Sequence, residues 1–591
     1  ANMTINHRDD LDRVQRELAG IEGVTVLLYD QTCAAEKRRR RKRGAFPDPD
    51  RRVIINELVC EGCGDCGVKS NCVSVQPLET EFGRKRKIDQ SSCNKDFSCV
   101  NGFCPSFVTV HGATPRKAKA GDLQKAGGAQ SASALPEPPA PKLPEIGAQP
   151  YSILVSGVGG TGVVTISAIL GMAAHLEGKG VGVIDMAGLA QKGGAVYCHV
   201  KIANRAEDVH AIRVAAGEAD LALGCDLVVA GTRKVLSAID KGETGVFVNS
   251  TEVYPGEITR MADFSLPGER VKAAVRDAAG DNYDFVDASA AAAALLGNSI
   301  GANMFMLGFA WQRGFVPLSE ASILRAIELN GEAVAMNAEA FHWGRRAAND
   351  PKAFEAFVAP LVKPAQSREK SKSLDETIER RVKYLAAYQN AAYAARYKKR
   401  VEKALAAEHA HAPGATDYAH AVARYLFKLM AVKDEYEVAR LYTDGSFKRQ
   451  LNAAFDNVGK LEFHFAPPIL GRKDENGLAI KTTFGPWAMS LLRVLAGLKF
   501  LRGGALDIFG RTAERRQERQ LLADYEKMLD ELEASLNPAS HGLAVQLAAI
   551  PEKIRGYGHV KESHIVKAKA EEEKLLAKFR MQQTPMPVAA E

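Results

Sequence analysis

The sequence predicts a multidomain α/β protein, and three observations along its 591 residues lead to that prediction. Seven cysteines gather between Cys60 and Cys104. From residue 151 onward, short apolar runs alternate with helix-like segments, which is typical of a doubly wound parallel sheet. Residues 373–580 carry apolar side chains mostly at helical spacing, so the C-terminal third is expected to be mainly helical.

The composition is that of an ordinary soluble protein, with 46% hydrophobic and 25% charged residues. No apolar stretch approaches the ~18 residues that a membrane span needs, so we expect no membrane association. The formal net charge of +7 is modest for this length and does not indicate a nucleic-acid partner. Ten cysteines without secretory features favour the reducing cytoplasm, where thiols are free to bind metal.

Residues 1–43 predict a helix, a strand and a second helix, from the segments LDRVQREL, GVTVLLYD and CAAEKRRRRKR. Because one such unit cannot form a stable sheet by itself, we expect the tail of a larger α/β domain. The basic run Lys37–Arg43 is either a solvated helix end that packs against that domain or a surface that steers an acidic partner protein. Nucleic acid is the least favoured partner, since no aromatic platform accompanies the charge.

The spacing of Cys60, Cys63 and Cys66 in CEGCGDC indicates a [4Fe–4S] cluster. A thiolate at every third residue wraps a short loop around a compact cluster. In bacterial ferredoxins the fourth ligand is a distant cysteine followed by proline, and Cys104 has that neighbour. We therefore expect residues 44–112 to form a ferredoxin-like iron–sulfur module with these four cysteines as ligands.

Other interpretations of the cysteines stay open. Structural zinc is the main alternative, because the pairs that begin at Cys60 and Cys99 could supply four sulfurs. A disulfide framework is disfavoured, because seven clustered thiols are an odd number and no signal peptide is evident. Cys72, Cys93 and Cys99 form a possible second metal site. Three ligands are one short of a full set, so we predict a single cluster.

An Ala/Pro/Gly/Ser-rich segment over residues 113–149 predicts a mobile linker, after which an α/β domain is expected over residues 150–349. YSILVSG predicts a buried strand, GVGGTG a turn and VVTISAILGMAAHLEG a helix. The segments GVGVIDMAG, AVYCHVKI, DLVVAG and GVFVNS predict further strands. Residues 298–346 have a helical pattern and are expected to pack onto the sheet.

The turn after the first strand fits G-x-G-x-x-G and is a candidate phosphate site, because backbone N–H groups face outward at a helix N-terminus. The candidate binding residues are Gly157, Gly159, Gly160, Thr161 and Gly162 in the turn, with Gln191, Gly193 and Gly194 in a loop at the same edge of the sheet. Asp185 stands where a dinucleotide fold would bind a ribose. The alternative is that the glycines serve only tight packing of the strand against the helix.

Residues 350–372 are interpreted as a second connection and residues 373–580 as a mainly helical C-terminal extension. The apolar stripes expected to form its core are Tyr384, Tyr388, Ala391 and Ala395, and Leu521, Tyr525, Met528, Leu529, Leu532 and Leu536. A strand is predicted at 461–465. His409 and His411 favour a solvated helix end over metal ligands.

The order of these parts resembles the bacterial indolepyruvate ferredoxin oxidoreductases, which are 2-oxoacid:ferredoxin oxidoreductases. The resemblance lies in the tail CAAEKRRRRKR, in VCEGCGDC with CNKDFSC and GFCP, and in ILVSGVGGTGVVTISAILG with LAQKGGAVYCHVKI. It implies that residues 1–43 end a pyrophosphate-binding domain for thiamine diphosphate. Residues 150–349 would be the superfamily's gamma domain, which does not use NAD, and residues 373–580 the helical extension of the long bacterial forms.

This resemblance also implies a reaction and its partners. An aryl pyruvate would be oxidatively decarboxylated to an arylacetyl-CoA, with coenzyme A as cosubstrate, and electrons would pass through iron–sulfur clusters to ferredoxin in a homo-oligomeric enzyme. No GDG…N motif is found, so thiamine diphosphate and Mg²⁺ are expected in a missing half, either fused to this chain or a separate subunit. The alternative function is a non-catalytic module in which a zinc-containing segment joins a phosphate-binding α/β domain to a helical interaction domain.

Overall fold

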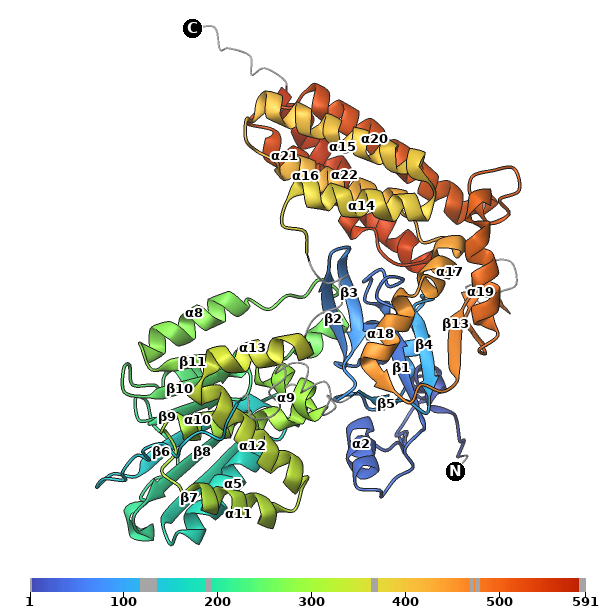
Figure 1. Cartoon of the computed structure of the whole chain (residues 1–591). Helices are drawn as coiled ribbons and strands as arrows, with labels where there is room; N and C mark the ends of the chain where they lie inside the picture. The colour runs from blue at the N-terminus through green and yellow to red at the C-terminus, as the bar shows by residue number, and fades with distance from the viewer. Residues whose placement is uncertain are drawn as a thin grey trace. The chain divides into compact units, whose positions relative to one another are not determined.

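The computed structural model describes residues 3–116, 135–187, 194–362, 370–467, 472–473 and 479–583 (Figure 1). The chain divides into two compact units. One consists of residues 1–50 with 94–96, and the other of residues 51–93 with 97–591. No helix in the described ranges is both long and apolar enough to cross a membrane.

The first unit contains η1 (Arg8–Asp10), α1 (Leu11–Ala19) and α2 (Ala34–Lys42), which confirm the two predicted helices. The strand predicted between them is wrong, because residues 24–30 lie outside any helix or strand. Val24, Val26 and Leu28 are 98%, 82% and 90% exposed. A strand needs a hydrogen-bonded neighbour, and the described part of this unit provides none for the run.

The cysteine-rich segment is built on two antiparallel strand pairs. β1 (Arg51–Ile55) pairs with β4 (Phe107–His111), and β2 (Val75–Thr80) forms a hairpin with β3 (Gly83–Ile88). The short helices α3 (Asp65–Ser70) and η2 (Ser98–Asn101) lie in the connecting segments. Because Ile55 stands opposite Phe107, the loop that follows β1 and the loop that precedes β4 start at the same edge of this sheet.

A segment far along the chain extends the same sheet. β13 (Leu461–Phe465) pairs with β4 and with β16 (Thr482–Phe484), so the strand order is β1-β4-β13-β16. The strand predicted at 461–465 is therefore confirmed. β12 (Phe455–Asp456) also pairs with β5 (Thr114–Pro115). Part of the C-terminal region thus shares a sheet with the cysteine-rich segment, which the separate patterns of the two regions do not reveal.

The α/β domain is built on a six-stranded sheet with the order β11-β10-β9-β6-β8-β7. Its strands are β6 (Tyr151–Val158), β7 (Gly180–Ala187), β8 (Ala195–Ala203), β9 (Leu221–Gly224), β10 (Gly245–Asn249) and β11 (Tyr283–Val286). The predicted all-parallel sheet is wrong at one strand, since β8 is antiparallel to β6 and β7. Residues 188–194 alone join β7 to β8, which is too short for the crossover that parallel neighbours need.

Helices cover both faces of this sheet, which confirms the doubly wound α/β architecture (Figure 1). One face carries α5 (Val163–Leu176), α9 (Ala288–Leu296), α10 (Ala302–Gln312), α11 (Glu320–Asn330), α12 (Val334–Asn349) and α13 (Pro351–Val362). The other carries α6 (Leu227–Ala230), α7 (Arg233–Leu236) and α8 (Gly268–Ala279). The helical prediction for 298–346 is confirmed.

Two local predictions in this domain are corrected. DLVVAG forms α6 and not a strand, because the Asp226 carboxylate accepts hydrogen bonds from the N–H groups of Val228 and Val229 and caps a helix. The proposed connection at 350–372 begins with α13, which buries Phe354 and Phe357 in the domain core. The composition of each segment is compatible with the predicted and the observed structure. The hydrogen bonds and core contacts that each segment makes determine which one forms.

The end of the proposed linker packs against the α/β domain. The linker predicted over 113–149 begins too early, since Thr114–Pro115 form β5, and residues 117–134 lie outside the described residues. Residues 135–149 form no helix or strand, as expected for a linker. Nevertheless Leu135 is buried in the domain core, and Glu137 forms an ion pair with Arg345 at 2.7 Å. Arg345 also donates a hydrogen bond to the Pro138 carbonyl. This stretch is therefore tied to α12 by both apolar and charged contacts.

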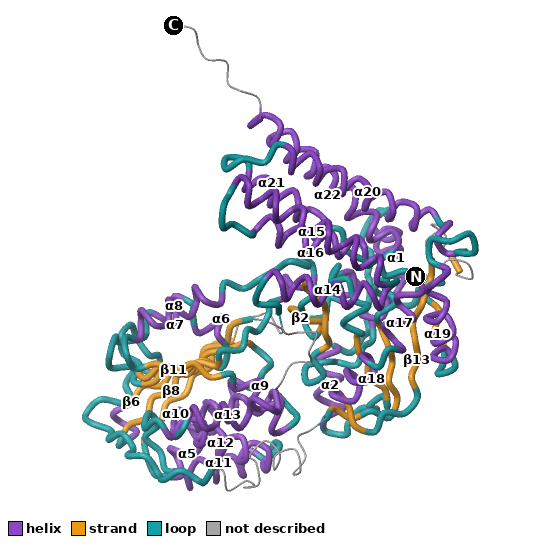
Figure 2. The backbone as a smooth tube through the Cα atoms, turned by 45° about the horizontal axis from the view of Figure 1, so that its top comes forward, coloured by secondary structure: helices purple, strands orange, loops and turns teal. Residues whose placement is uncertain are grey.

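The C-terminal region is mainly helical, as predicted, and six of its helices pack alongside one another (Figure 2). Its helices are α14 (Leu374–Tyr388), α15 (Ala391–His411), α16 (Asp417–Met430), α17 (Glu435–Thr443), α18 (Ser446–Ala454), α19 (Ala488–Gly497), α20 (Ala513–Ala534), α21 (His541–Ala549) and α22 (Gly558–Gln583).

The stripe from Leu521 to Leu536 is buried, which confirms it as a core face. Ala391 and Ala395 are exposed, because α14 ends before them and α15 starts a new face. His409 and His411 lie exposed at a helix end, as predicted.

Candidate functional site

Four cysteines from the two ends of the cysteine-rich segment line one cavity. Its wall includes Cys60, Cys63, Cys66 and Cys104, with Phe107 beside them. The three-cysteine loop follows β1 and the last cysteine precedes β4, and these two strands are paired. The structure therefore brings together the four residues that the sequence proposes as ligands.

Glycines let the backbone close around this cavity. Gly62 and Gly64 have φ angles of +69° and +83°, which glycine adopts far more readily than other residues. The Gly62 N–H donates a hydrogen bond to the Cys60 Sγ at 3.3 Å, as outer-shell donors do for metal-bound thiolates. A Cβ at Gly102 would stand 2.7 Å from the Cα of Cys66. A side chain there would push the two cysteine loops apart.

Cations from other segments lie around the cysteines. Lys85 and Arg86 on β3 are buried, and Lys481 precedes β16. Burial lowers the pKa of Lys481, and attraction to Cys104 and Cys66 counters part of that effect. The site thus combines four potential anions with nearby positive charge. Sequence reasoning missed these residues, since basic side chains on a hairpin and in a loop ordinarily indicate solvent exposure.

The thiols themselves are poorly solvated. Burial raises the pKa of Cys60, Cys63 and Cys66, and the electrostatic effect of the neighbouring Cys104 raises it further. Thiolates are the form that binds metal, so a cation at the centre would displace these protons on binding.

The spacing of the cysteine sulfurs can be compared with the spacing in a zinc site. In a tetrahedral zinc site with Zn–S bonds of ~2.3 Å, the sulfurs lie about 3.8 Å apart. Across the described ranges, the only set of three or more potential ligands with ligand atoms within 4.8 Å of one another is Glu137, Glu320 and His342. No three of the four cysteine sulfurs therefore lie within 4.8 Å of one another in this structure.

The second group of cysteines lies close to the first. Cys72 and Cys99 pack against the same apolar cluster that contains Cys60 and Cys66. Cys72, Cys93 and Cys99 are all partly exposed. No fourth ligand for them is evident among the described residues, so a second metal site stays a prediction.

The glycine turn of the α/β domain is occupied by internal contacts. A Cβ at Gly157 would stand 2.7 Å from Val163 Cγ2 and 2.9 Å from Cys225 Cβ. Gly160 and Gly162 have φ angles of +83° and +99°. The Thr161 hydroxyl donates to the Val158 carbonyl at 2.7 Å. These contacts support the packing interpretation of the turn.

The surroundings of the turn disfavour a phosphate. The buried Asp226 carboxylate lies 3.6 Å from the position of a Cβ at Gly157, and burial raises its pKa to about 6. Asp185 accepts a hydrogen bond from Ser167 at 2.7 Å, so this acid is engaged by α5. Gly159 donates to the carbonyl of Gly194 at 2.7 Å, which joins the turn to the neighbouring loop. The other two loop candidates, Gln191 and Gly193, lie outside the described residues.

Replacing Gly157 by alanine should lower the free energy of unfolding of the α/β domain by about 1–3 kcal/mol, because the new methyl group overlaps Val163 and Cys225. Urea unfolding followed by circular dichroism measures the effect. Gly256→Ala is the matched control, since no atom lies within 4 Å of its Cβ position. Equal stability of the two variants would show that the turn has room for a side chain and would restore the ligand-binding interpretation.

Two protein families match the chain. Residues 152–347 match the family described as pyruvate ferredoxin/flavodoxin oxidoreductase, and residues 374–574 match a family of unknown function, DUF6537. Curated archaeal proteins named indolepyruvate oxidoreductase subunit IorB are similar as well. The protein from Pyrococcus horikoshii is 30% identical over 203 residues, which are 34% of this chain and 96% of that protein. The protein from Methanothermobacter thermautotrophicus is 30% identical over 202 residues, 34% of this chain and 97% of that protein.

Solved structures match a similar share of the chain. The pyruvate oxidoreductase subunit PORC from Thermotoga maritima is 21% identical, with a TM-score of 0.25, and the match covers 33% of this chain and 96% of that subunit. The gamma subunit of a keto/oxoacid ferredoxin oxidoreductase from Geobacter sulfurreducens is 22% identical, with a TM-score of 0.24, and the match covers 34% and 98% of the two chains.

Proposed function

Because this chain belongs to the indolepyruvate ferredoxin oxidoreductase family, we propose that it is the electron-transfer and gamma-domain part of such an enzyme. The assembled enzyme would decarboxylate an aryl pyruvate oxidatively to an arylacetyl-CoA, with coenzyme A as cosubstrate and ferredoxin as electron acceptor. We also propose that the chain works in the reducing cytoplasm, where its clustered thiols would be free to bind metal.

The observation that carries this proposal is the cavity lined by Cys60, Cys63, Cys66 and Cys104. These residues would hold a [4Fe–4S] cluster, which supplies one-electron transfer when it is bound. The chain's own groups fit that role. The Gly62 N–H hydrogen-bonds a ligand sulfur, and the apolar neighbours of the cysteines keep water away. The nearby lysines and arginine offset the negative charge of the thiolates.

A thiamine diphosphate-binding half with Mg²⁺ is proposed as the partner. In the first unit, residues 24–30 are rich in strand-forming side chains and expose Val24, Val26 and Leu28 to solvent. A strand-forming run without a neighbour gains hydrogen bonds and burial when a sheet is supplied. This run therefore supports a contact with a larger α/β domain.

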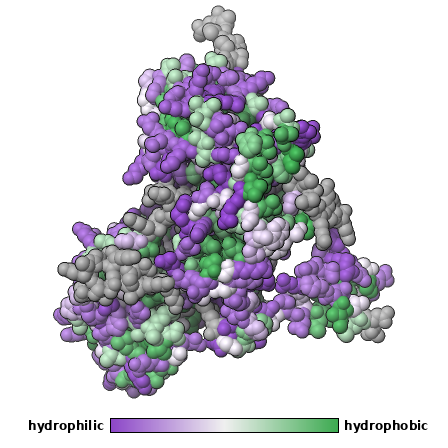
Figure 3. Space-filling view, turned by 45° about the vertical axis from the view of Figure 1, so that its right-hand side comes forward, coloured by the Kyte–Doolittle hydropathy of each residue, from purple (hydrophilic) through white to green (hydrophobic). Residues whose placement is uncertain are grey.

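An exposed apolar patch supports a further protein contact. Figure 3 shows it as a green area over α19 and the segment that follows. Its members are Trp487, Leu491, Val494, Phe500, Leu506 and Ile508, each more than half exposed. Contiguous apolar surface of this kind marks protein interfaces. Either the thiamine-binding half or a second copy of the chain in a homo-oligomer would cover it.

Reconstitution tests the proposed function. Purified anaerobically, this chain alone should neither bind thiamine diphosphate nor decarboxylate indolepyruvate. Addition of the thiamine-binding half should produce coenzyme A-dependent reduction of ferredoxin or a viologen dye, followed by absorbance. Assays without coenzyme A and with 2-oxoglutarate in place of indolepyruvate are the controls. Turnover by the isolated chain, or a preference for 2-oxoglutarate, would contradict the proposal.

A further inference from the structure

A second cavity lies between the β2–β3 hairpin and the C-terminal helices. Its volume is about 570 Å³, within the range of small-molecule sites. The hairpin contributes residues 79–85, and α14, α16 and η10 (Ile550–Lys553) contribute most of the remaining wall. This cavity adjoins the one lined by the four cysteines, since Glu61 lines both, but none of the four cysteines lines it.

The walls of this cavity are rigidly built. Phe82 at the hairpin tip packs between Tyr384 and Phe427, with ring centroids 5.2 and 5.5 Å away. Glu81 beside it forms a buried ion pair with Arg381 of α14. A cavity held by interlocked aromatic rings and a buried ion pair keeps its shape without a ligand, which lowers the entropic cost of binding one.

Positive charge predominates in the lining, with nine basic and five acidic side chains. Most of the carboxylate side chains of the lining already form ion pairs with basic side chains. Glu79 pairs with Arg84 at 2.6 Å, and Glu61 pairs with Lys433. Asp263 pairs with Arg555. Each of these carboxylates pairs with one cation, and Glu61 also attracts Lys85 and Lys428, so the lining keeps an excess of positive charge.

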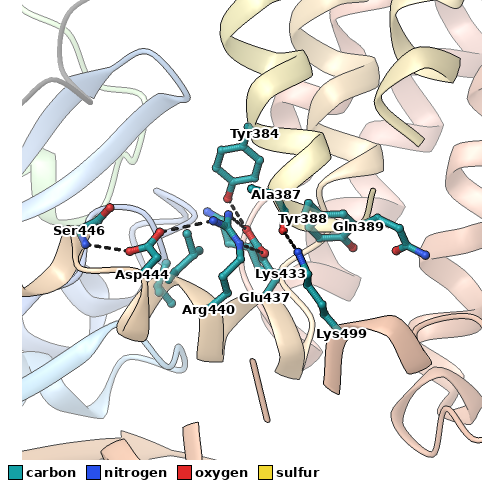
Figure 4. A network of polar contacts seen from close by, with 12 residues as sticks. Tyr384, Ala387, Tyr388, Gln389, Lys433, Glu437, Arg440, Asp444, Ser446 and Lys499 are labelled. Carbon is teal, nitrogen blue, oxygen red and sulfur yellow. Dashed lines mark hydrogen bonds and ion pairs between the residues drawn. The ribbon is translucent and has the colours of Figure 1, made fainter. Parts of the chain in front are cut away.

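The carboxylate behind the wall is engaged as well. Glu437 is fully buried beneath Tyr384, whose hydroxyl donates to it at 2.5 Å, and Arg440 binds it at 2.7 Å (Figure 4). Asp444 in turn accepts from Arg440 and from the Ser446 N–H. This network is closed on itself and contributes no free negative charge to the cavity.

Four cations of the lining form no direct ion pair with a carboxylate among the described residues. These cations are Lys85, Lys370, Arg424 and Lys428, and two of them, Lys85 and Lys428, are attracted by the Glu61 carboxylate from beyond ion-pair distance. Lys428 donates to the backbone carbonyls of Pro551 and Glu552 at 2.8 and 3.0 Å. Burial lowers the pKa of Lys428 to about 7, and attraction to the Glu61 carboxylate counters part of that effect.

We propose that this cavity binds a small phosphate-bearing anion between Arg424, Lys428 and Lys85. A phosphate group carries multiple charges and several acceptor oxygens, which match two ammonium groups and one guanidinium. Lys85 is 5% exposed and also lies near the cysteines, so its substitution would affect both sites. Substitutions of Arg424 and Lys428 therefore test this cavity without disturbing the cysteines. A free phosphate or pyrophosphate and the diphosphate of a nucleotide share this chemistry.

Isothermal titration of the full chain with pyrophosphate, in 150 mM NaCl, tests the proposal. Arg424→Gln and Lys428→Met should each weaken pyrophosphate binding at least tenfold. The Arg424 side chain is exposed, so its variant keeps the fold. Lys403→Gln is the matched control, because this lysine of α15 is not part of the cavity lining and pairs with Asp530 at 2.6 Å. The Lys403→Gln variant should bind pyrophosphate with the same affinity as the parent chain.

Titration with adenosine diphosphate shows whether the cavity prefers a nucleotide or a free phosphate. Tighter binding than pyrophosphate identifies a nucleotide, and equal or weaker binding identifies a free phosphate. Absence of saturable binding of both anions, or unchanged affinity in Arg424→Gln and Lys428→Met, would overturn the proposal. The measurement requires no turnover, so its failure would leave the proposed oxidoreductase function untouched.

Discussion

Replacing Cys63 by serine should abolish most of the iron in anaerobically purified protein. The parent chain is expected to hold about four irons, with a broad absorbance near ~400 nm that bleaches with dithionite. Loss of one of the four thiolates leaves one iron of the cluster without its cysteine ligand. That iron is then open to ligand exchange and to oxidation. Iron per chain, measured chemically, and the absorbance spectrum give two independent readings of the same change.

The control for this experiment is Cys198→Ala. Cys198 is fully buried in β8 of the six-stranded sheet, away from the four-cysteine cavity, so the variant should keep its iron. Colourless parent protein with one zinc per chain would contradict the iron–sulfur proposal and favour the zinc-containing binding module. About eight irons per chain would show that Cys72, Cys93 and Cys99 find a fourth ligand and that a single cluster is an undercount.

Replacing Gly344 by alanine should destabilise the α/β domain by about 3 kcal/mol or more. Gly344 on α12 lies against α10, and a Cβ there would stand 1.9 Å from the carbonyl oxygen of Phe305. Gly308 on α10 has the reciprocal geometry, with 2.0 Å to the Phe341 carbonyl oxygen. The two helices meet backbone to backbone, so a methyl group forces them apart. Thermal unfolding should shift by roughly 6–12 °C.

Gly497→Ala is the control for that shift. Gly497 ends α19 and no atom lies within 4 Å of its Cβ position, so alanine should be neutral or stabilising by up to about 1 kcal/mol. If Gly344→Ala unfolds within about 2 °C of the parent, the backbone contact between α10 and α12 is looser than the structure has it. The Gly308→Ala variant should then also be tolerated.

Local sequence was informative where chemistry depends on spacing. The positions of Cys60, Cys63 and Cys66, with the later Cys104, predict a ligand set, and the structure lines one cavity with all four. Periodicity also identified the core stripe of α20, since a helix buries every third or fourth residue whatever it packs against. Such features belong to one segment and need no knowledge of the rest of the fold.

Sequence reasoning failed where a segment's state depends on its neighbours. DLVVAG and residues 24–30 both have strand-forming composition. One is a helix because Asp226 caps it, and the other is not a strand because it has no pairing partner. The antiparallel β8 likewise follows from the short connection to β7. Each outcome is set by hydrogen bonds that apolar composition does not encode.

The sequence by itself determined the four candidate ligands, the α/β nature of residues 150–349 and the helical character of the C-terminal third. Only the tertiary structure decided that β13 joins β4 and that Lys85, Arg86 and Lys481 lie around the cysteines. It alone assembled a cationic cavity from a hairpin and two distant helices. The physical reason is that side-chain spacing is a local property, whereas charge balance and burial are sums over residues brought together from far along the chain.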